Sequence, residues 1–458
     1  MSEEKKITRN RREFIKEGVA LVAGTAAVSL AEEGCTGSNF LTGRGRARAS
    51  AFASAPIERV RIGFVGVGGM GSAHVRNFLE IDGVEIKAVC DIVPEKVERA
   101  QNWVVERGGT KPAGYSKGPW DFKRMCENED LDLVFTATPW EWHVPVCVEA
   151  MKNGKHAATE VPAAVTLDEC WQLVETAEKN RKHCVMMENC CYDRQELMTL
   201  NMVRKGLLGE VLHAECGYLH DLREVKFSNQ GEGLWRRQHS WKRNGNLYPT
   251  HGLGPVAQCL NINRGDAFDF LVSLSSPSRG LQEYARKTFG PDSPQAKEKF
   301  ALGDVNTSVI RTRLGKTIIV IHDTNLPRPY TRINLVQGTR GIVRKWPHEV
   351  YVEGRSPAHE WQPFDDYAPE FEHPLWSKLA VKGEERGHGG MDFIEDYRLI
   401  ECLLKGEAPD FDVYDAAAWS AVTALSERSV LSRGKPQQFP DFTRDLWKTN
   451  PPLRIIGG

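Results

Sequence analysis

The chain has 458 residues and a formal net charge of −1 at pH 7, from 60 Lys and Arg against 61 Asp and Glu. The length predicts two or three domains with ample core, and the even charge balance argues against nucleic acid as a partner. The 11 cysteines include no CxxC pair and the 13 histidines include no HExxH. We therefore expect buried free thiols and no bound metal.

Residues 1–33 are typical of an export signal. Arg11 and Arg12 stand before Phe14 in a basic stretch, and an apolar run spans residues 19–31. This basic segment and short apolar run form a signal-peptide pattern, and paired arginines indicate the Tat route. We expect export to the periplasm, with no membrane span.

Residues 34–56 are rich in Gly, Ser, Ala and Arg and are predicted to form a linker. Cys35 follows Gly34 and raises the alternative of a lipid anchor. The preceding Glu32 and Glu33 disfavour that alternative.

Residues 57–190 carry the pattern of a dinucleotide-binding domain. An apolar stretch, 59–67, leads into a loop with Gly66, Gly68, Met70 and Gly71, and a helix is predicted from residue 72. Glycines at these spacings permit a tight turn, close approach of a pyrophosphate and close helix packing. A lone GxGxxG is weak evidence for a dinucleotide site, but here the motif joins a predicted strand to a predicted helix, which strengthens that evidence.

A second predicted strand, 84–90, ends in Asp91, twenty residues past Gly71. An acid at this place binds the ribose hydroxyls of a dinucleotide. Ile92, Val93 and Pro94 follow, and none of them could bind a 2′-phosphate. We therefore predict NAD rather than NADP as the cofactor.

Further strand and helix units follow, with strands at 131–137, 156–159 and 184–187 and helices at 143–153 and 167–181. Polar and aromatic side chains stand just after these strands, where ligands bind in parallel sheets. These residues are Trp140, Glu141, Trp142, His143, Glu160, Glu188 and Asn189.

The pattern changes from about Leu208, where strands recur with longer connections. These strands are 211–218, 268–274, 305–314 and 317–323, and helices are predicted at 390–404 and 413–431. We predict an α/β fold: an N-terminal Rossmann domain with a doubly wound parallel sheet, then an α+β domain over 191–458. The second sheet is expected to be largely antiparallel, and the late helices are expected to pack back on the Rossmann domain.

Two segments of this second half, 235–251 and 322–330, are dense in His, Tyr and Arg. Neighbouring Tyr and His side chains can share general-base duties, although a tyrosine base needs a lowered pKa. A single histidine is more often a hydrogen-bonded structural residue. The functional interpretation therefore depends on geometry.

Residues 57–192 resemble the Gfo/Idh/MocA oxidoreductase superfamily. Longer stretches resemble glycoside hydrolase family 109, the NAD-dependent α-N-acetylgalactosaminidases. The matching segments are TPWEWH (138–143), EVPAAVTLDECW (160–171), ENCCY (188–192), NMVRKG (201–206), GYLHDLR (217–223), NGNLYPTHGLGP (244–255), HDTNLPRPY (322–330) and GHGGMD (387–392).

Two departures from ordinary sugar dehydrogenases favour the narrower family. Those enzymes usually carry Glu-Lys-Pro where this chain has Glu160-Val161-Pro162, so the lysine that handles the hydroxyl proton is absent. They also often place Asp where Leu247 stands, four residues before His251.

The resemblance implies which residues bind each ligand. The implied NAD contacts are Met70, Gly71, Asp91, Trp140, Glu141, Trp142, His143, Glu160, Val161 and Asn189. The implied sugar site consists of Tyr218, Arg236, Tyr248, Pro249, Thr250, His251 and Tyr330, with Glu188 orienting the sugar or polarising a ketone.

The resemblance also implies a redox route to hydrolysis of terminal α-linked N-acetylgalactosamine. NAD oxidises the C3 hydroxyl, a base removes the acidified C2 proton, and the aglycone leaves from C1. Water then adds and the hydride returns to C3, so NAD is regenerated. Tyr218 is the candidate base at C2 and His251 the candidate at the C3 hydroxyl, and the two could exchange roles.

Other functions stay open at this point. One alternative is an exported sugar oxidoreductase with a net redox product, and another is a non-catalytic dinucleotide or sugar sensor. An ordinary glycosidase using two carboxylates, Glu188 and Asp221, is a further possibility. The sequence leaves the oligomeric state open and is compatible with a homo-oligomer.

Overall fold

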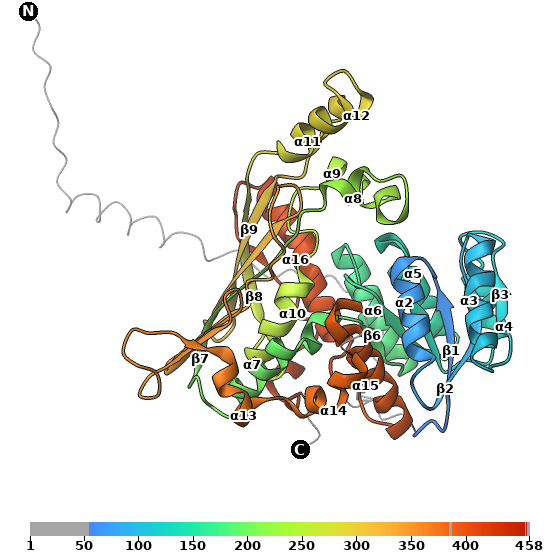
Figure 1. Cartoon of the computed structure of the whole chain (residues 1–458), viewed down its shortest axis with the longest axis horizontal. Helices are drawn as coiled ribbons and strands as arrows, with labels where there is room; N and C mark the ends of the chain where they lie inside the picture. Colours follow the sequence, from blue (N-terminus) through green and yellow to red (C-terminus); the bar gives the residue numbers. More distant parts are fainter. Residues whose placement is uncertain (1–54, 384–386, 454, 456–458) are drawn as a thin grey trace, which may run out of the picture. The chain divides into compact units, whose positions relative to one another are not determined.

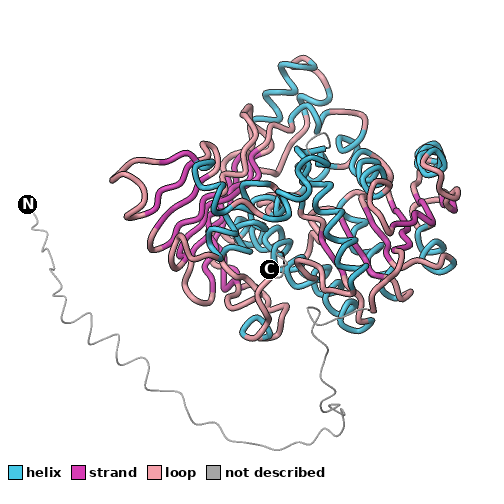
Figure 2. The backbone as a smooth tube through the Cα atoms, turned by 60° about the horizontal axis from the view of Figure 1, so that its bottom comes forward, coloured by secondary structure: helices cyan, strands magenta, loops and turns pink. Residues whose placement is uncertain are grey.

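The computed structural model describes residues 55–383, 387–453 and 455. The predicted signal segment, Cys35 and the linker as far as residue 54 lie outside the described residues. The described chain forms two β-sheets with helices packed around them (Figures 1 and 2). No helix within these ranges combines the length and the apolar character needed to cross a bilayer.

Within the described residues, the first sheet has six strands in the order β3-β2-β1-β4-β5-β6, and each neighbouring pair is parallel. Its strands are β1 (Val60–Val65), β2 (Val84–Cys90), β3 (Ala113–Tyr115), β4 (Leu133–Thr136), β5 (His156–Thr159) and β6 (Cys184–Met186). The helices among them are α2 (Gly69–Phe78), α3 (Pro94–Glu106), α4 (Phe122–Asn128), α5 (His143–Lys152) and α6 (Leu167–Asn180). The strand order changes direction between β1 and β4, which is where ligands bind in doubly wound sheets. The prediction of a Rossmann-type sheet is confirmed.

Burial explains why these strands could be read from the sequence. Every residue of β4, β5 and β6 is buried, and parallel strands covered on both faces form continuous apolar runs. Helix α6 begins with a capping box, in which Thr166 accepts from the Glu169 amide and the Glu169 carboxylate accepts from the Thr166 amide. Such a cap satisfies amides that the first helical turn leaves free.

Within the described residues, the second sheet has nine strands in the order β14-β13-β12-β11-β7-β10-β9-β8-β15. They are β7 (Val211–Leu219), β8 (Phe268–Ser275), β9 (Val305–Thr312), β10 (Thr317–Asp323), β11 (Leu335–Gly338), β12 (Gly341–Arg344), β13 (Glu349–Val352), β14 (Gln362–Pro363) and β15 (Gln437–Gln438). Strands β7 and β10 are parallel, and the other pairs are antiparallel. The prediction of a largely antiparallel sheet is confirmed.

The helices of this second half are α7 (Arg194–Arg204), α8 (Arg223–Phe227), α9 (Arg236–Lys242), α10 (Thr250–Cys259), α11 (Gly280–Phe289), α12 (Pro294–Lys297), α13 (Ala368–Phe371), α14 (Pro374–Gly383), α15 (Met391–Lys405) and α16 (Val413–Leu431). Helix α10 lies directly on β7. A Cβ added to Gly252 would collide with the backbone of Gly217. The glycine therefore permits the close approach that brings the start of α10 beside Tyr218.

The two late helices contact helices of the first half of the chain. Helix α16 packs against α6 and α15 packs against α2. Helix α16 is itself buried on every side for most of its length, as expected for an apolar helix in the middle of a protein. The predicted domain boundary between residues 190 and 191 stays a prediction.

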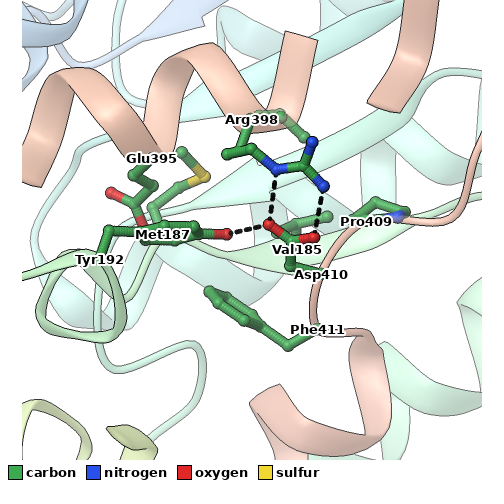
Figure 3. A pocket seen from close by; sticks show the side chains of 9 residues that line it. Val185, Met187, Tyr192, Glu395, Arg398, Pro409, Asp410 and Phe411 are labelled. Carbon is green, nitrogen blue, oxygen red and sulfur yellow. Dashed lines mark hydrogen bonds and ion pairs between the residues drawn. The ribbon is translucent and has the colours of Figure 1, made fainter. Parts of the chain in front are cut away.

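A cavity lies between β6 and α15 (Figure 3). On one side, Asp410 accepts hydrogen bonds from the Tyr192 hydroxyl at 3.0 Å and from Arg398 at 2.7 and 3.0 Å. On the other side, neither carboxyl oxygen of the buried Glu395 has a hydrogen-bond partner among the described residues. Burial raises the pKa of Glu395 well above its usual value, and the charge of Asp396 adds to the effect.

Candidate active site

The glycine loop after β1 fits a pyrophosphate. Gly66 has φ 82°, and a Cβ on Gly71 would collide with the Gly66 carbonyl oxygen, so this turn requires glycine at both positions. A Cβ on Gly69 would instead meet nothing within 4 Å, and one on Gly68 would meet only the Lys96 ammonium at 4.0 Å. Helix α2 begins here without a side-chain cap, so its first amides are available to an anion. Lys96 adds a positive charge that the sequence interpretation missed.

Asp91 lies at the end of β2, beside this loop. Its two carboxylate oxygens accept hydrogen bonds from the amides of Val67 at 2.9 Å and Val93 at 3.0 Å. A carboxylate can accept about four bonds, so both oxygens keep capacity for ribose hydroxyls. The loop and Asp91 together fit a dinucleotide.

The segment TPWEWH forms a short 3-10 helix, η2 (Trp140–Trp142), after β4. The Trp140 ring is buried and stacks on Tyr248, with ring centroids 5.7 Å apart. Glu141 is exposed and lies 3.9 Å from His239, whereas Trp142 packs edge-on against Trp120. Trp140 thus joins the predicted cofactor loop to the predicted sugar site.

His143 is buried, and its two ring nitrogens lie 2.8 Å from the carbonyl oxygens of Pro162 and Thr138. The imidazole therefore supports the loop after β4, and its nitrogens are not free for a dinucleotide. Val161 is also buried, and its amide donates to the Glu160 carboxylate at 3.2 Å.

Glu160 is held by a chain of buried groups that the sequence interpretation missed. Its Oε1 lies 2.7 Å from His74 Nε2, and His74 Nδ1 lies 2.9 Å from Asp396 of α15. Burial alone would lower the pKa of His74, but Asp396 and Glu160 together raise it well above its usual value. The resulting imidazolium ties α2, the end of β5 and α15 into one unit.

Asn189 is positioned in a similar way by the segment that contains GHGGMD. Its amide nitrogen donates to Asp392 at 2.6 Å, and His388 Nδ1 lies 2.7 Å from the other oxygen of Asp392. The hydrogen bond to Asp392 raises the pKa of His388. The late motif therefore supports a residue that follows β6.

A histidine and a carboxylate form the centre of the site. His251, in the first turn of α10, places Nδ1 2.7 Å from Oε1 of Glu188, which follows β6 and is fully buried. Burial raises the pKa of Glu188, but His251 and Thr250 outweigh it and the net pKa lies below the usual value. An ionised carboxylate on Nδ1 fixes the imidazole tautomer that leaves Nε2 able to accept a proton.

Aromatic rings surround His251. The Tyr218 centroid lies 4.6 Å from Tyr248, 5.4 Å from His251 and 6.1 Å from Tyr330. The Tyr218 hydroxyl also lies 3.0 Å from Nδ1 of His220, a residue that the sequence interpretation missed. It stands two residues after Tyr218 in GYLHDLR, so the period of the strand could have indicated it.

Arg236 is buried among these rings. Its guanidinium carbon lies 5.0 Å from the ring centroid of Tyr248 and 5.1 Å from that of Trp140, and it forms an ion pair with Glu232 at 2.8 Å. The structure thus brings together the predicted sugar-site residues Tyr218, Arg236, Tyr248, Thr250, His251 and Tyr330, with Pro249 preceding α10.

A tyrosine base needs a lowered pKa, and Tyr218 does not have one in this structure. Burial raises the pKa of Tyr218 to about 12, although Arg236 acts in the opposite direction. Burial likewise raises the pKa of Tyr248 well above its usual value. Both phenols are therefore protonated at neutral pH, and His251 with Glu188 is the base that the geometry supports.

Glu188, Cys190 and His251 place potential metal ligands within 4.8 Å of one another. However, Nδ1 of His251 and Oε1 of Glu188 are already paired with each other at 2.7 Å. Burial also raises the pKa of the Cys190 thiol well above its usual value. A protonated thiol is a poor ligand, so we interpret this group as a histidine–carboxylate pair. The ten described cysteines are all buried and free, which confirms the prediction for them.

Comparison with known proteins identifies the family. A profile described as "Glycosyl hydrolase 109, C-terminal domain" matches residues 192–449, and one described as "Oxidoreductase family, NAD-binding Rossmann fold" matches residues 60–188. The chain is 45% identical over 455 residues to "Glycosyl hydrolase family 109 protein 1" of Shewanella sp. (strain MR-4), covering 98% of this chain and 99% of the relative. It is 44% identical over 454 residues to "Alpha-N-acetylgalactosaminidase" of Shewanella oneidensis, with the same two coverages.

Solved structures share the fold at low identity. Levoglucosan dehydrogenase in complex with NADH and L-sorbose aligns with a TM-score of 0.65 at 18% identity, covering 84% of this chain and 100% of that chain. Myo-inositol 2-dehydrogenase from Lactobacillus plantarum aligns with a TM-score of 0.60 at 15% identity, covering 83% and 100%. With its NAD-binding Rossmann domain and its matching second domain, the chain belongs to glycosyl hydrolase family 109.

Proposed function

We propose that this chain removes terminal α-linked N-acetylgalactosamine from glycoconjugates through an NAD-dependent route. The relative from Shewanella oneidensis that carries this activity in its name covers 98% of the chain. The observation that carries the proposal is the Glu188–His251 pair, because it puts a base at the end of β6. The carboxyl ends of the same sheet bear the residues that fit a dinucleotide.

NAD, when bound, would supply a hydride acceptor that returns the hydride later, so that cleavage involves no net redox change. His251 accepts a proton from the sugar at Nε2 twice, first from the C3 hydroxyl and, after that proton has passed to solvent, from C2. Glu188 stabilises the imidazolium that forms each time. Tyr218 donates a hydrogen bond from its phenol to a sugar oxygen. Arg236 fixes a carbonyl or hydroxyl oxygen through its fork of donors.

An ordinary two-carboxylate hydrolysis has less support. Asp221 forms an ion pair with Arg223 at 2.7 Å, and the hydrogen bond to Arg223 lowers the pKa of Asp221. Glu188 is buried against His251. A retaining or inverting glycosidase needs two carboxyl groups that flank the bond, one of them protonated, and both of these carboxyls are held ionised by a cationic or basic partner.

The direct test uses purified protein and para-nitrophenyl α-N-acetylgalactosaminide without added NAD. We expect release of nitrophenol and of free N-acetylgalactosamine, with NAD recovered from the denatured protein. Stoichiometric accumulation of NADH with an oxidised sugar would instead support a sugar oxidoreductase. A protein that binds sugar and NAD without turnover would support a sensor.

We also propose export through the Tat route, with loading of NAD before export. The Arg11–Arg12 pair and the following apolar run support the Tat route. Because this route carries folded proteins, NAD can be bound before export. Replacing both arginines with lysine should keep active protein in the cytoplasm. Normal periplasmic delivery of that variant would contradict the proposal.

A further inference from the structure

Trp346 is an aromatic side chain beside the predicted sugar site that the function described above does not use. It lies in the connection between β12 and β13, and 38% of it is exposed. Its ring centroid lies 6.2 Å from that of Tyr330, which in turn lies 6.1 Å from Tyr218. Trp346 therefore follows Tyr330 in a series of neighbouring rings that begins at Tyr218.

A buried ion cluster holds the Trp346 ring from one side. The guanidinium carbon of Arg332 lies 5.3 Å and the ammonium of Lys345 4.6 Å from the ring centroid. Both cations are bonded to Asp193 and Glu196 at 2.6 to 2.8 Å. The cations share the same two carboxylates, so they hold the indole in place through cation–π contacts, and Tyr330 and His348 contact it edge-on at 6.2 Å. The side chain nevertheless keeps 38% of its surface exposed.

The backbone also favours a specific role for this tryptophan. Trp346 has φ 62°, in the left-handed region that large side chains rarely adopt. Such a conformation persists only where the surroundings impose it, and it is often found at ligand sites. Here the imposed conformation keeps an indole partly exposed beside Tyr330.

We infer that Trp346 forms an aglycone subsite, on which the sugar ring next to the terminal N-acetylgalactosamine stacks. This inference rests on the proposed function. With the terminal sugar held among Tyr218, His251 and Tyr330, its aglycone has to leave the group of buried rings. Trp346 is the partly exposed ring beside Tyr330. An indole face suits the apolar C–H face of a pyranose, because both surfaces lose contact with water on stacking.

The test compares two substrates that differ only in the aglycone: an α-N-acetylgalactosaminyl-galactose disaccharide and methyl α-N-acetylgalactosaminide. Trp346→Ala should lower kcat/KM for the disaccharide about tenfold, which corresponds to exposing roughly 50 Å² of stacked apolar surface. The methyl glycoside has no ring to stack, so its kcat/KM should change less than about twofold. Trp346→Phe should retain most of the preference for the disaccharide over the methyl glycoside, measured as the ratio of the two kcat/KM values.

Trp361→Ala is the matched control. Trp361 is also 38% exposed, and it stacks on Arg344 at 4.3 Å. Its replacement should leave the ratio of kcat/KM for the disaccharide to kcat/KM for the methyl glycoside unchanged.

Equal losses on both substrates for Trp346→Ala would overturn the inference, since they would mean a structural role or a contact with the terminal sugar. A Trp346→Ala variant with full activity and an unchanged ratio of the two kcat/KM values would also overturn the inference. If the unsubstituted protein cleaves neither substrate, the proposed function itself fails.

Discussion

Nδ1 of His251 lies 2.7 Å from the fully buried carboxylate of Glu188, which joins the first turn of α10 to the end of β6. The two residues are 63 positions apart in the sequence. Their contact puts a base from the second half of the chain at the ligand edge of the first sheet. The first sheet and helix α10 thus each contribute one member of this proton-accepting pair.

Glu188→Gln should lower kcat by about 10²–10⁴-fold, because a neutral amide neither fixes the tautomer of His251 nor stabilises its imidazolium. NAD content should not change, since Asp91 and the glycine loop remain. The double variant with His251→Gln should be little worse than either single variant, because groups that act as a unit are not additive. Fully additive losses would show that the two residues act separately.

Tyr218→Phe should cost less than the loss of His251. With a pKa of about 12, Tyr218 acts as a hydrogen-bond donor, and one such bond is worth about 1–3 kcal/mol, or roughly 5- to 150-fold in kcat/KM. The pH at which activity is lost on the acid side should stay where it is in the unsubstituted protein, because the Tyr218 phenol is protonated throughout that range. A larger loss, with disappearance of a limb of the pH profile, would return the role of base to Tyr218.

Asp91→Ala should weaken NAD binding and leave the second sheet folded. The carboxylate should bind the ribose hydroxyls, and each charge-assisted bond contributes about 1.5–3 kcal/mol. NAD in the denatured supernatant measures the effect, and circular dichroism checks the fold. Unchanged NAD content would mean that Asp91 only orders the turn through the amides of Val67 and Val93.

Glu395→Gln should stabilise the protein at alkaline pH. The folded pKa of Glu395 lies well above the ordinary 4.5, so the folded state holds a proton that the unfolded chain loses near that pH. Its contribution to stability is fully present below about pH 4.5 and is lost as the pH rises through the folded pKa. The variant should therefore melt about 1–3 °C higher than the unsubstituted protein at pH 8 and at a similar temperature at pH 4.5.

The control for this comparison is Glu98→Gln on the exposed face of α3, which should melt like the unsubstituted protein at both pH values. A Glu395→Gln variant that is less stable at pH 8 would contradict the account of the cavity in Figure 3.

Much of the fold could be predicted because its elements have strong local signals. Strands β2, β5 and β10 and helix α16 contain the same residues as predicted. Strands β11 to β15 were missed, because they have only two to four residues each and, unlike the four-residue β5, none of them is buried throughout. They therefore show neither an apolar run nor enough alternations to be recognised.

The site was predicted as a set of residues but not as a network. Motifs identified His251, Glu188 and Tyr218 separately, and no spacing could show that the first two are bonded. His74 was missed because its partner Asp396 lies 322 positions away. The pKa of Tyr218 could not be foreseen either, because it depends on burial that only the folded chain creates.

The central claim is that hydrolysis passes through removal of the proton at C2 of the sugar, and heavy water tests it most directly. Hydrolysis of an α-N-acetylgalactosaminide in heavy water should give N-acetylgalactosamine that carries deuterium at C2, as read by mass spectrometry and proton NMR. A substrate deuterated at C2 should lose that label to ordinary water in parallel. Two results together would contradict this account and indicate direct displacement. The product would keep the original hydrogen or deuterium at C2 in both experiments, and the substrate deuterated at C2 would show no isotope effect on kcat/KM.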